Sequence, residues 1–225
     1  SRLGSEAIAA LTFTMPVFFI LISINSGLSS GVGSYVSRAL GARNYKLAGN
    51  IVLHGIVISI FAALLILIFG NIFAVDFFSI IGASGNTLKL SLDYFRVILF
   101  GQTFMFLVQI INTVFIAQGH SKMATQNQIF SLLVNLILDP IFIYGLKMGV
   151  AGAAWATFIS FVVGFVYSLF SLKNSPLPIS FKLFEKSMGI AWEILKIGVP
   201  ASFMTLFMAI TGIFVNKFLS YFGDN

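Results

Sequence analysis

The sequence predicts an all-α integral membrane protein, a polytopic bundle of six transmembrane helices. Its 225 residues include 13 Lys and Arg and 7 Asp and Glu, so that only 9% are charged, where a soluble domain carries roughly 25%. Hydrophobic residues make up 58% of the chain, and the mean hydropathy is +1.01. A soluble fold of this length could not cover its surface with so few charges, so soluble classes are excluded.

Each predicted helix is an apolar window long enough to cross a bilayer, which takes roughly 20 residues. The windows cover residues 7–37, 51–75, 97–118, 123–146, 148–172 and 197–216. Only the fourth window contains a charge, Asp139. Pro16, Pro140 and Pro200 lie within the windows and are predicted bend points, because a proline inside a helix frees a backbone carbonyl.

The second half of the first window is rich in small residues. Gly27, Gly31 and Gly33 are accompanied by four serines between residues 23 and 30. Small residues let helix backbones approach each other closely in a membrane. We therefore expect another helix to pack against this part of the chain.

Lys and Arg are unevenly divided between the connections, eight on one side and five on the other. The excess places residues 38–50, 119–122 and 173–196 in the cytoplasm, and both chain ends outside. His54 and His120 then lie at cytoplasmic helix ends, where we expect them to be interfacial. The basic residues are scattered singly, so the net charge of +6 indicates contact with membrane lipids and not with nucleic acid.

The longest connection, 173–196, has a helical repeat of its own. Its apolar positions include Phe181, Phe184, Met188 and Leu195 on one face, with charged residues opposite. This pattern predicts an amphipathic helix that lies in the cytoplasmic interface.

Asp139 is the candidate for cation coupling, because a carboxylate inside a membrane span costs at least about 2.5–3.5 kcal/mol and therefore marks an ion path, a proton path or a partner. Asn135 lies one helical turn earlier on the same face, and Pro140 frees further carbonyl oxygens. Oxygen clusters of this kind suit Na⁺. Burial could instead make Asp139 a proton carrier, or the residue could simply end its helix in solvent.

Other polar residues inside the spans point to a substrate cavity. Among them, Asn112 and Gln109 in the third window are the residues that we expect to face a small organic substrate. The sequence contains no cysteine, no Ser-His-Asp set and no paired carboxylates, so we expect no enzyme activity and no cofactor. The implied coupling ion is Na⁺ or H⁺.

Three segments of the sequence carry recognisable motifs. The first is Met15-Pro16 with residues 31–42 (GVGSYVSRALGA), the second is residues 135–140 (NLILDP) with residues 149–157 (GVAGAAWAT), and the third is residues 196–200 (KIGVP). In this order and at this spacing they resemble the second to seventh helices of the multidrug and toxic compound extrusion family of antiporters. The chain end also weakly repeats the chain start, which indicates one repeat of a larger protein.

The resemblance implies a twelve-helix, two-lobe transporter that exports amphipathic or cationic compounds in exchange for Na⁺ or H⁺. Residues 1–172 would form most of the N-terminal lobe without its first helix, 173–196 the cytoplasmic linker, and 197–225 the first helix of the C-terminal lobe. The remaining half of the chain would then be its partner. The expected location is the cytoplasmic membrane of a prokaryote.

Within the family, the DinF-like branch is the nearest likeness. Its cation site uses an acid on the first helix, outside this chain, together with positions that match Asn135, Asp139 and Thr157. Two alternatives stay open: a flippase for lipid-linked precursors, which would need a basic central cavity, and a membrane subunit or receptor that transports nothing.

Overall fold

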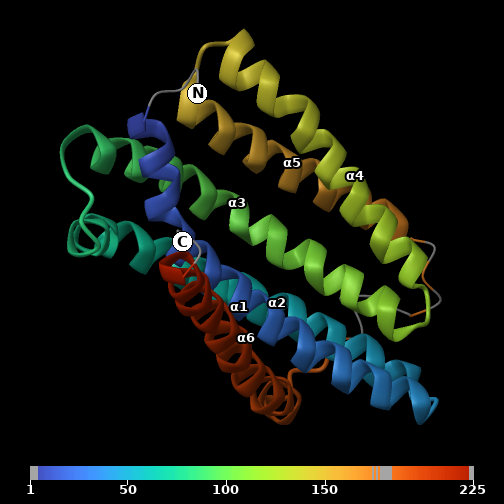
Figure 1. Ribbon diagram of the computed structural model, residues 1–225. Helices are drawn as coiled ribbons and strands as arrows, with labels where there is room; N and C mark the ends of the chain where they lie inside the picture. The colour runs from blue at the N-terminus through green and yellow to red at the C-terminus, as the bar shows by residue number, and fades with distance from the viewer. Residues whose placement is uncertain (1–4, 174, 176, 178–183, 223–225) are drawn as a thin grey trace.

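The structure is a computed structural model that describes residues 5–173, 175, 177 and 184–222 (Figure 1). The described residues form helices and no strand, in the order α1 (Ser5–Gly41), α2 (Tyr45–Ile80), α3 (Gly85–Ala117), α4 (Ser121–Pro140), the π-helical turn η1 (Ile141–Gly145), α5 (Gly149–Leu172) and α6 (Met188–Phe222). Six of the described segments are long and apolar enough to cross a membrane. This confirms the six predicted spans.

The helix α3 lies at the centre of the bundle and packs against α1, α2, α4 and α5 (Figure 1). Its buried face includes Phe106, Ile110 and Val114, which join one core with α1 and α2. On its other side, Ile111 and Phe115 pack with the start of α4 and the end of α5. The short connections between consecutive helices force antiparallel neighbours, so the central helix holds side chains from both sides of the lobe.

The helix α6 crosses α1 at a contact made by glycines. A Cβ on Gly31 would lie 2.3 Å from the carbonyl oxygen of Ile194, and one on Gly27 would lie 2.4 Å from that of Gly198. Only glycine permits backbones to approach this closely. The predicted packing of another helix on this part of α1 is therefore confirmed.

The described part of the linker does not contain the predicted amphipathic helix. Phe184 to Ser187 are not helical, and Met188 begins α6, which continues without a break through the membrane span. Phe181 lies outside the described residues. The prediction of a separate helix was wrong because residues 188–196 are the first turns of α6, where Ile190 and Ile194 pack on α1 and α2, whereas Met188 of the predicted apolar face is 82% exposed.

Residues 184–187 bind along the first turns of α2 instead. The Glu185 carboxylate lies 2.5 Å from Lys46 Nζ, and its backbone N–H donates to Asn50 Oδ1 at 3.0 Å. The backbone N–H of Ser187 donates to His54 Nε2 at 3.1 Å, and Phe184 packs on the imidazole at 4.8 Å between ring centres. The sequence analysis expected His54 to be interfacial. In the structure its side chain is instead buried between α2 and the linker and is only 5% exposed.

The three prolines behave differently. Pro16 and Pro200 lie inside helices that continue past them, and Figure 1 shows α1 changing direction in its N-terminal part. Pro140 ends α4 and is followed directly by the π-helical turn. The α-helix thus gives way to a π-helical turn directly after Asp139 and Pro140.

Candidate cation and substrate site

Asp139, Asn135 and Thr157 come together where α4 and α5 face each other. The Asn135 amide Nδ2 lies 3.4 Å from Asp139 Oδ1 and 3.4 Å from Thr157 Oγ1. Both contacts are longer than the 2.7–3.2 Å of a typical N–H···O bond. The Thr157 hydroxyl donates to the carbonyl of Ala153 at 2.9 Å, so its oxygen stays directed at the cluster. The three residues predicted from sequence therefore lie together in one polar cluster, and their role in cation coupling stays a prediction.

The π-helical turn after Pro140 fixes the distance between the two helices. Proline has no N–H to donate and its ring crowds the preceding turn, and the helix responds with wider i to i+5 bonds, such as Leu146 N–H to the carbonyl of Ile141 at 2.8 Å. Gly152 on α5 packs against this turn, since a Cβ there would lie 2.7 Å from the carbonyl oxygen of Phe142. The turn thus lets α5 approach the end of α4 that carries Asp139.

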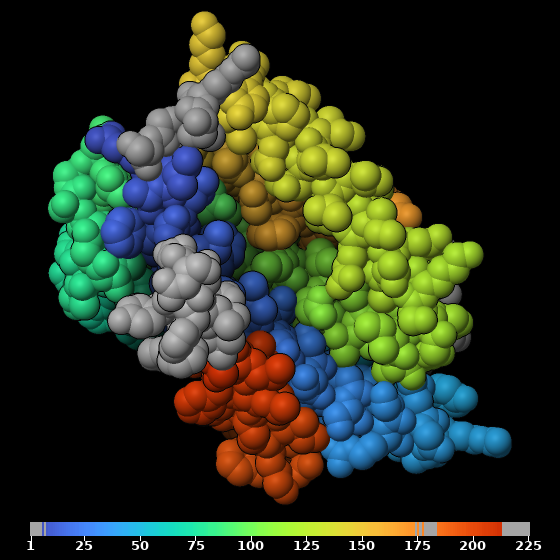
Figure 2. Space-filling view, in the orientation of Figure 1, coloured from blue at the N-terminus to red at the C-terminus, as the bar shows by residue number. Residues whose placement is uncertain are grey.

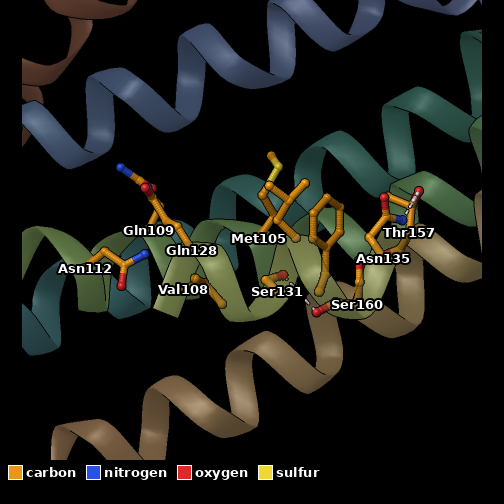
Figure 3. A pocket seen from close by; sticks show the side chains of 11 residues that line it. Met105, Val108, Gln109, Asn112, Gln128, Ser131, Asn135, Thr157 and Ser160 are labelled. Atoms are coloured by element: carbon orange, nitrogen blue, oxygen red, sulfur yellow. Dashed lines mark hydrogen bonds between the residues drawn. The ribbon is translucent and has the colours of Figure 1, made fainter. Parts of the chain in front are cut away.

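A polar cavity of about 390 Å³ opens beside this cluster, between α3, α4 and α5. Figure 3 shows Asn135 and Thr157 at one end and the carboxamides of Asn112, Gln109 and Gln128 at the other. The lining residues are Met105, Val108, Gln109, Asn112, Gln128, Ser131, Leu132, Asn135, Thr157, Ser160 and Phe161. Both residues predicted for a substrate cavity, Asn112 and Gln109, therefore share a cavity with two of the predicted cation ligands.

At the end of the cavity away from Asp139, a chain of hydrogen bonds joins α5, α4 and α3. Ser171 on α5 donates to Asn127 Oδ1 at 3.0 Å, and Asn127 Nδ2 donates to Asn112 Oδ1 at 3.0 Å. Asn112 is fully buried, and its Nδ2 has no partner among the described residues. A buried amide without an acceptor implies an occupant that supplies one, such as water or a ligand.

Several residues of the site escaped the sequence analysis. Tyr94 on α3 is buried and packs with Val150 and Ala154 of α5, one turn before Thr157. Nothing in the sequence distinguishes this tyrosine from a core aromatic residue. Gln128 and Ser131 could have been found, because with Asn135 they recur every three or four residues and so form a polar stripe along α4.

This combination of six spans, a carboxylate at a proline-broken helix end and an adjoining polar cavity agrees with a match to known proteins. Residues 1–141 match the MatE family. The chain belongs to this family. It is 33% identical over 222 residues to the multidrug export protein MepA of Staphylococcus aureus (strain bovine RF122 / ET3-1), a match that covers 98% of this chain and 49% of MepA.

Solved MATE structures have the same fold as this MatE-family chain. A crystal structure of MATE in complex with MaL6 matches at a TM-score of 0.92 and 32% identity, over 96% of this chain and 49% of the other. An inward-facing multidrug resistance MATE family transporter of the MOP superfamily matches at 0.87 and 32%, over 92% and 48%. The chain thus spans about half the length of these relatives, which are transporters and not enzymes. Membership of the DinF-like branch stays a prediction.

Proposed function

We propose that this chain is half of a secondary antiporter that exports amphipathic or cationic organic compounds in exchange for Na⁺ or H⁺ by alternating access. In this proposal α1 to α5 belong to one lobe, the cytoplasmic linker ends before Met188, and α6 (Met188–Phe222) is the first helix of the other lobe. The multidrug export ascribed to MepA, which is similar over nearly the whole of this chain, supports the proposal. The other half of the transporter is then the partner of this chain.

The observation that supports the proposal most directly is that the cluster around Asp139 and the neighbouring cavity have two residues in common. Asn135 and Thr157 contact each other beside Asp139, and both also line the polar cavity. A cation bound at Asp139 and a compound bound in the cavity would therefore compete for the same side chains. Competition for one conformational equilibrium is what antiport requires.

The Asn135 amide shows how the cation would act. Its Nδ2 now donates toward both the Asp139 carboxylate and the Thr157 hydroxyl. Na⁺ binds oxygen atoms, and a protonated Asp139 would need an acceptor. Ligation of Na⁺ by Asn135 therefore needs the carboxamide to turn and present Oδ1, which removes the donor from Thr157 and changes the wall of the cavity, and a proton on the Asp139 oxygen that faces Asn135 would favour the same turn. Asp139, Asn135 and Thr157 are the ligands in the Na⁺ case.

The composition of the cavity favours this function over a flippase for anionic lipid-linked precursors. Such a flippase would need several Lys or Arg side chains in the cavity, and its lining contains none. The lining combines uncharged hydrogen-bonding groups with Met105, Leu132 and Phe161, which suits amphipathic organic compounds.

The test is Asp139→Asn in the complete transporter, reconstituted into vesicles with an imposed Na⁺ or pH gradient. The variant keeps the shape of the side chain but loses the charge, so we expect gradient-driven ethidium export to fall to the background rate while the protein remains folded. Asp76→Asn is the matched control, because Asp76 is exposed on α2 away from the cluster. Export by Asp139→Asn at the control rate would refute the coupling role.

A further inference from the structure

An aromatic groove lies between α3 and α5, on the face of α3 that is turned away from the polar cavity. It has a volume of about 440 Å³ and is lined by Arg96, Val97, Phe100, Phe104, Trp155 and Phe158. Phe100 comes nine positions before Gln109, which lines the cavity. This spacing is about two and a half helical turns and places the two side chains on opposite faces. Figure 2 shows α3 and α5, which pack side by side, at the bottom of the recess between α1 and α4.

Three aromatic rings form a fixed wall of the groove. Trp155 and Phe158 on α5 lie edge to face at 5.6 Å between ring centres, and Phe158 meets Phe104 of α3 in the same way at 6.1 Å. Large apolar surfaces nevertheless remain open, since Phe100 is 56% and Trp155 is 42% exposed. Within a membrane such a surface is covered by an apolar chain, and packed rings offer it a preformed shape.

Arg96 is the one charged side chain in the lining of the groove. It is exposed, and no carboxylate in the described part of the chain lies within 4.0 Å of its guanidinium, not even that of Asp93 one turn earlier. An arginine at membrane depth is retained where it meets an anionic or polar partner. The partner of Arg96 must therefore come from outside the described residues.

The depth of Arg96 indicates where that partner lies. Arg96 directly precedes the charge-free window 97–118. At about 1.5 Å per residue this window is about 33 Å long, which is close to the hydrocarbon thickness of about 30 Å. The long side chain of arginine can extend to the interface, so the guanidinium lies near the level of the lipid phosphates. Trp155, on the neighbouring helix, has the amphipathic ring that is typical of this level.

A phosphate above and an acyl chain below are the two parts of a phospholipid. The planar guanidinium of Arg96 can bind phosphate oxygens in a bidentate manner, and the indole N–H of Trp155 can donate to a second headgroup oxygen. A zwitterionic lipid brings an ammonium group that offsets its phosphate, whereas an anionic lipid leaves a net negative charge for Arg96. The charge of the groove therefore favours an anionic lipid.

We propose that the groove between α3 and α5 binds one anionic phospholipid, with its phosphate on Arg96 and an acyl chain along Phe100, Phe104 and Phe158. In the orientation predicted from the distribution of Lys and Arg, this lipid belongs to the outer leaflet. The inference does not rest on the proposed export function, because neither Asp139 nor the polar cavity takes part in it.

The test uses the fluorescence of Trp155 in the complete transporter, reconstituted into phosphatidylcholine vesicles that contain a small fraction of lipid brominated on its acyl chains. Bromine quenches tryptophan at close contact. The signal of Trp155 is the difference between each protein and its Trp155→Phe counterpart, which removes the contribution of Trp192 and of other tryptophans. We expect brominated phosphatidylglycerol to quench this signal at an about 5-fold lower fraction than brominated phosphatidylcholine, and Arg96→Gln to abolish the difference.

Lys89→Gln is the matched control, because Lys89 is exposed on α3 about two turns before Arg96 and does not line the groove. We expect this variant to keep the 5-fold preference. Quenching by phosphatidylcholine, which needs Trp155 on lipid but not Arg96, checks that each variant is folded.

Three results would overturn the proposal. An unchanged preference in Arg96→Gln would show that Arg96 does not bind the headgroup. An equal loss in Lys89→Gln would show a general attraction by surface charge and no site. Absence of quenching by either lipid in the unsubstituted protein would show that the groove is covered by protein.

Discussion

Replacing Gly152 by alanine tests whether the close contact between α5 and the π-helical turn sets the geometry of the cation site. The added Cβ would lie 2.7 Å from the carbonyl oxygen of Phe142 and 2.8 Å from its carbonyl carbon. Both are backbone atoms, so no side-chain rotation can relieve the clash. Ordinary contact begins at 3.4 Å, and α5 must therefore move away from the turn by about 0.7 Å.

This displacement is large enough to break the cluster. Thr157 lies five residues after Gly152 on the same rigid helix, and its contact with Asn135 is already 3.4 Å long. A further separation of several tenths of an ångström exceeds hydrogen-bond range. We expect Gly152→Ala to reduce cation-driven export at least tenfold, while overpacking lowers the unfolding free energy by about 1–3 kcal/mol.

The assay measures ethidium efflux from vesicles as a function of the imposed Na⁺ or pH gradient, with the melting temperature of the purified protein recorded in parallel. Gly145→Ala is the control, since Gly145 belongs to the π-helical turn but a Cβ at this position would have no described atom within 4 Å to clash with. The reasoning is refuted if the Gly152→Ala variant melts at a lower temperature but its ethidium efflux depends on the Na⁺ or pH gradient as in the unsubstituted protein. The contact would then have no link to the proposed cation site.

The packing of the helices and the linker supports three further predictions. Gly31→Ala should lower the melting temperature more than Gly41→Ala, because only the first places a Cβ against an α6 carbonyl, at 2.3 Å. Asn127→Leu removes the donor to the buried Asn112 Oδ1, whereas Ser171 keeps its bond to the Tyr167 carbonyl; we therefore expect the free energy of unfolding to fall by about 1–3 kcal/mol in chemical denaturation. His54→Leu removes the acceptor for a linker N–H and should increase protease cleavage within residues 173–187, whereas Lys46→Ala, in an exposed ion pair, should change cleavage little.

The spans and the glycine crossing could be predicted from the sequence because each follows from a local property. A stretch of about 20 apolar residues has no other stable placement than across a bilayer. Glycines one turn apart, at Gly27 and Gly31, provide a close-packing surface whatever the partner is. The sequence could not name the partner, because the approach of α6 to α1 is a long-range contact that no local pattern specifies.

The linker and Tyr94 show the limit of reasoning from periodicity. The apolar positions from Phe184 to Leu195 fit a helical face, but the pattern cannot say whether that face lies on lipid or on the bundle. In the structure the segment divides at Met188, because its first part bonds to Asn50 and His54 through the backbone. Tyr94 was missed for a related reason: its packing with Val150 and Ala154 joins α3 to α5 and leaves no trace in its own surroundings in the sequence.

The proposed coupling role of Asp139 depends on how little charge surrounds it. The adjoining cavity and a second hollow between α1 and α3 are lined by hydroxyls, carboxamides and apolar groups without any ionisable side chain. In such surroundings a cation that neutralises one carboxylate changes the local electrostatics strongly, since nearby charges that could offset it are absent from both linings. Asn135, Thr157 and Gln109 can then respond by reorienting, because an amide or hydroxyl exchanges donor for acceptor without a change of charge. The proposed switch therefore needs only the carboxylate of Asp139 among neutral hydrogen-bonding groups that can reverse their direction.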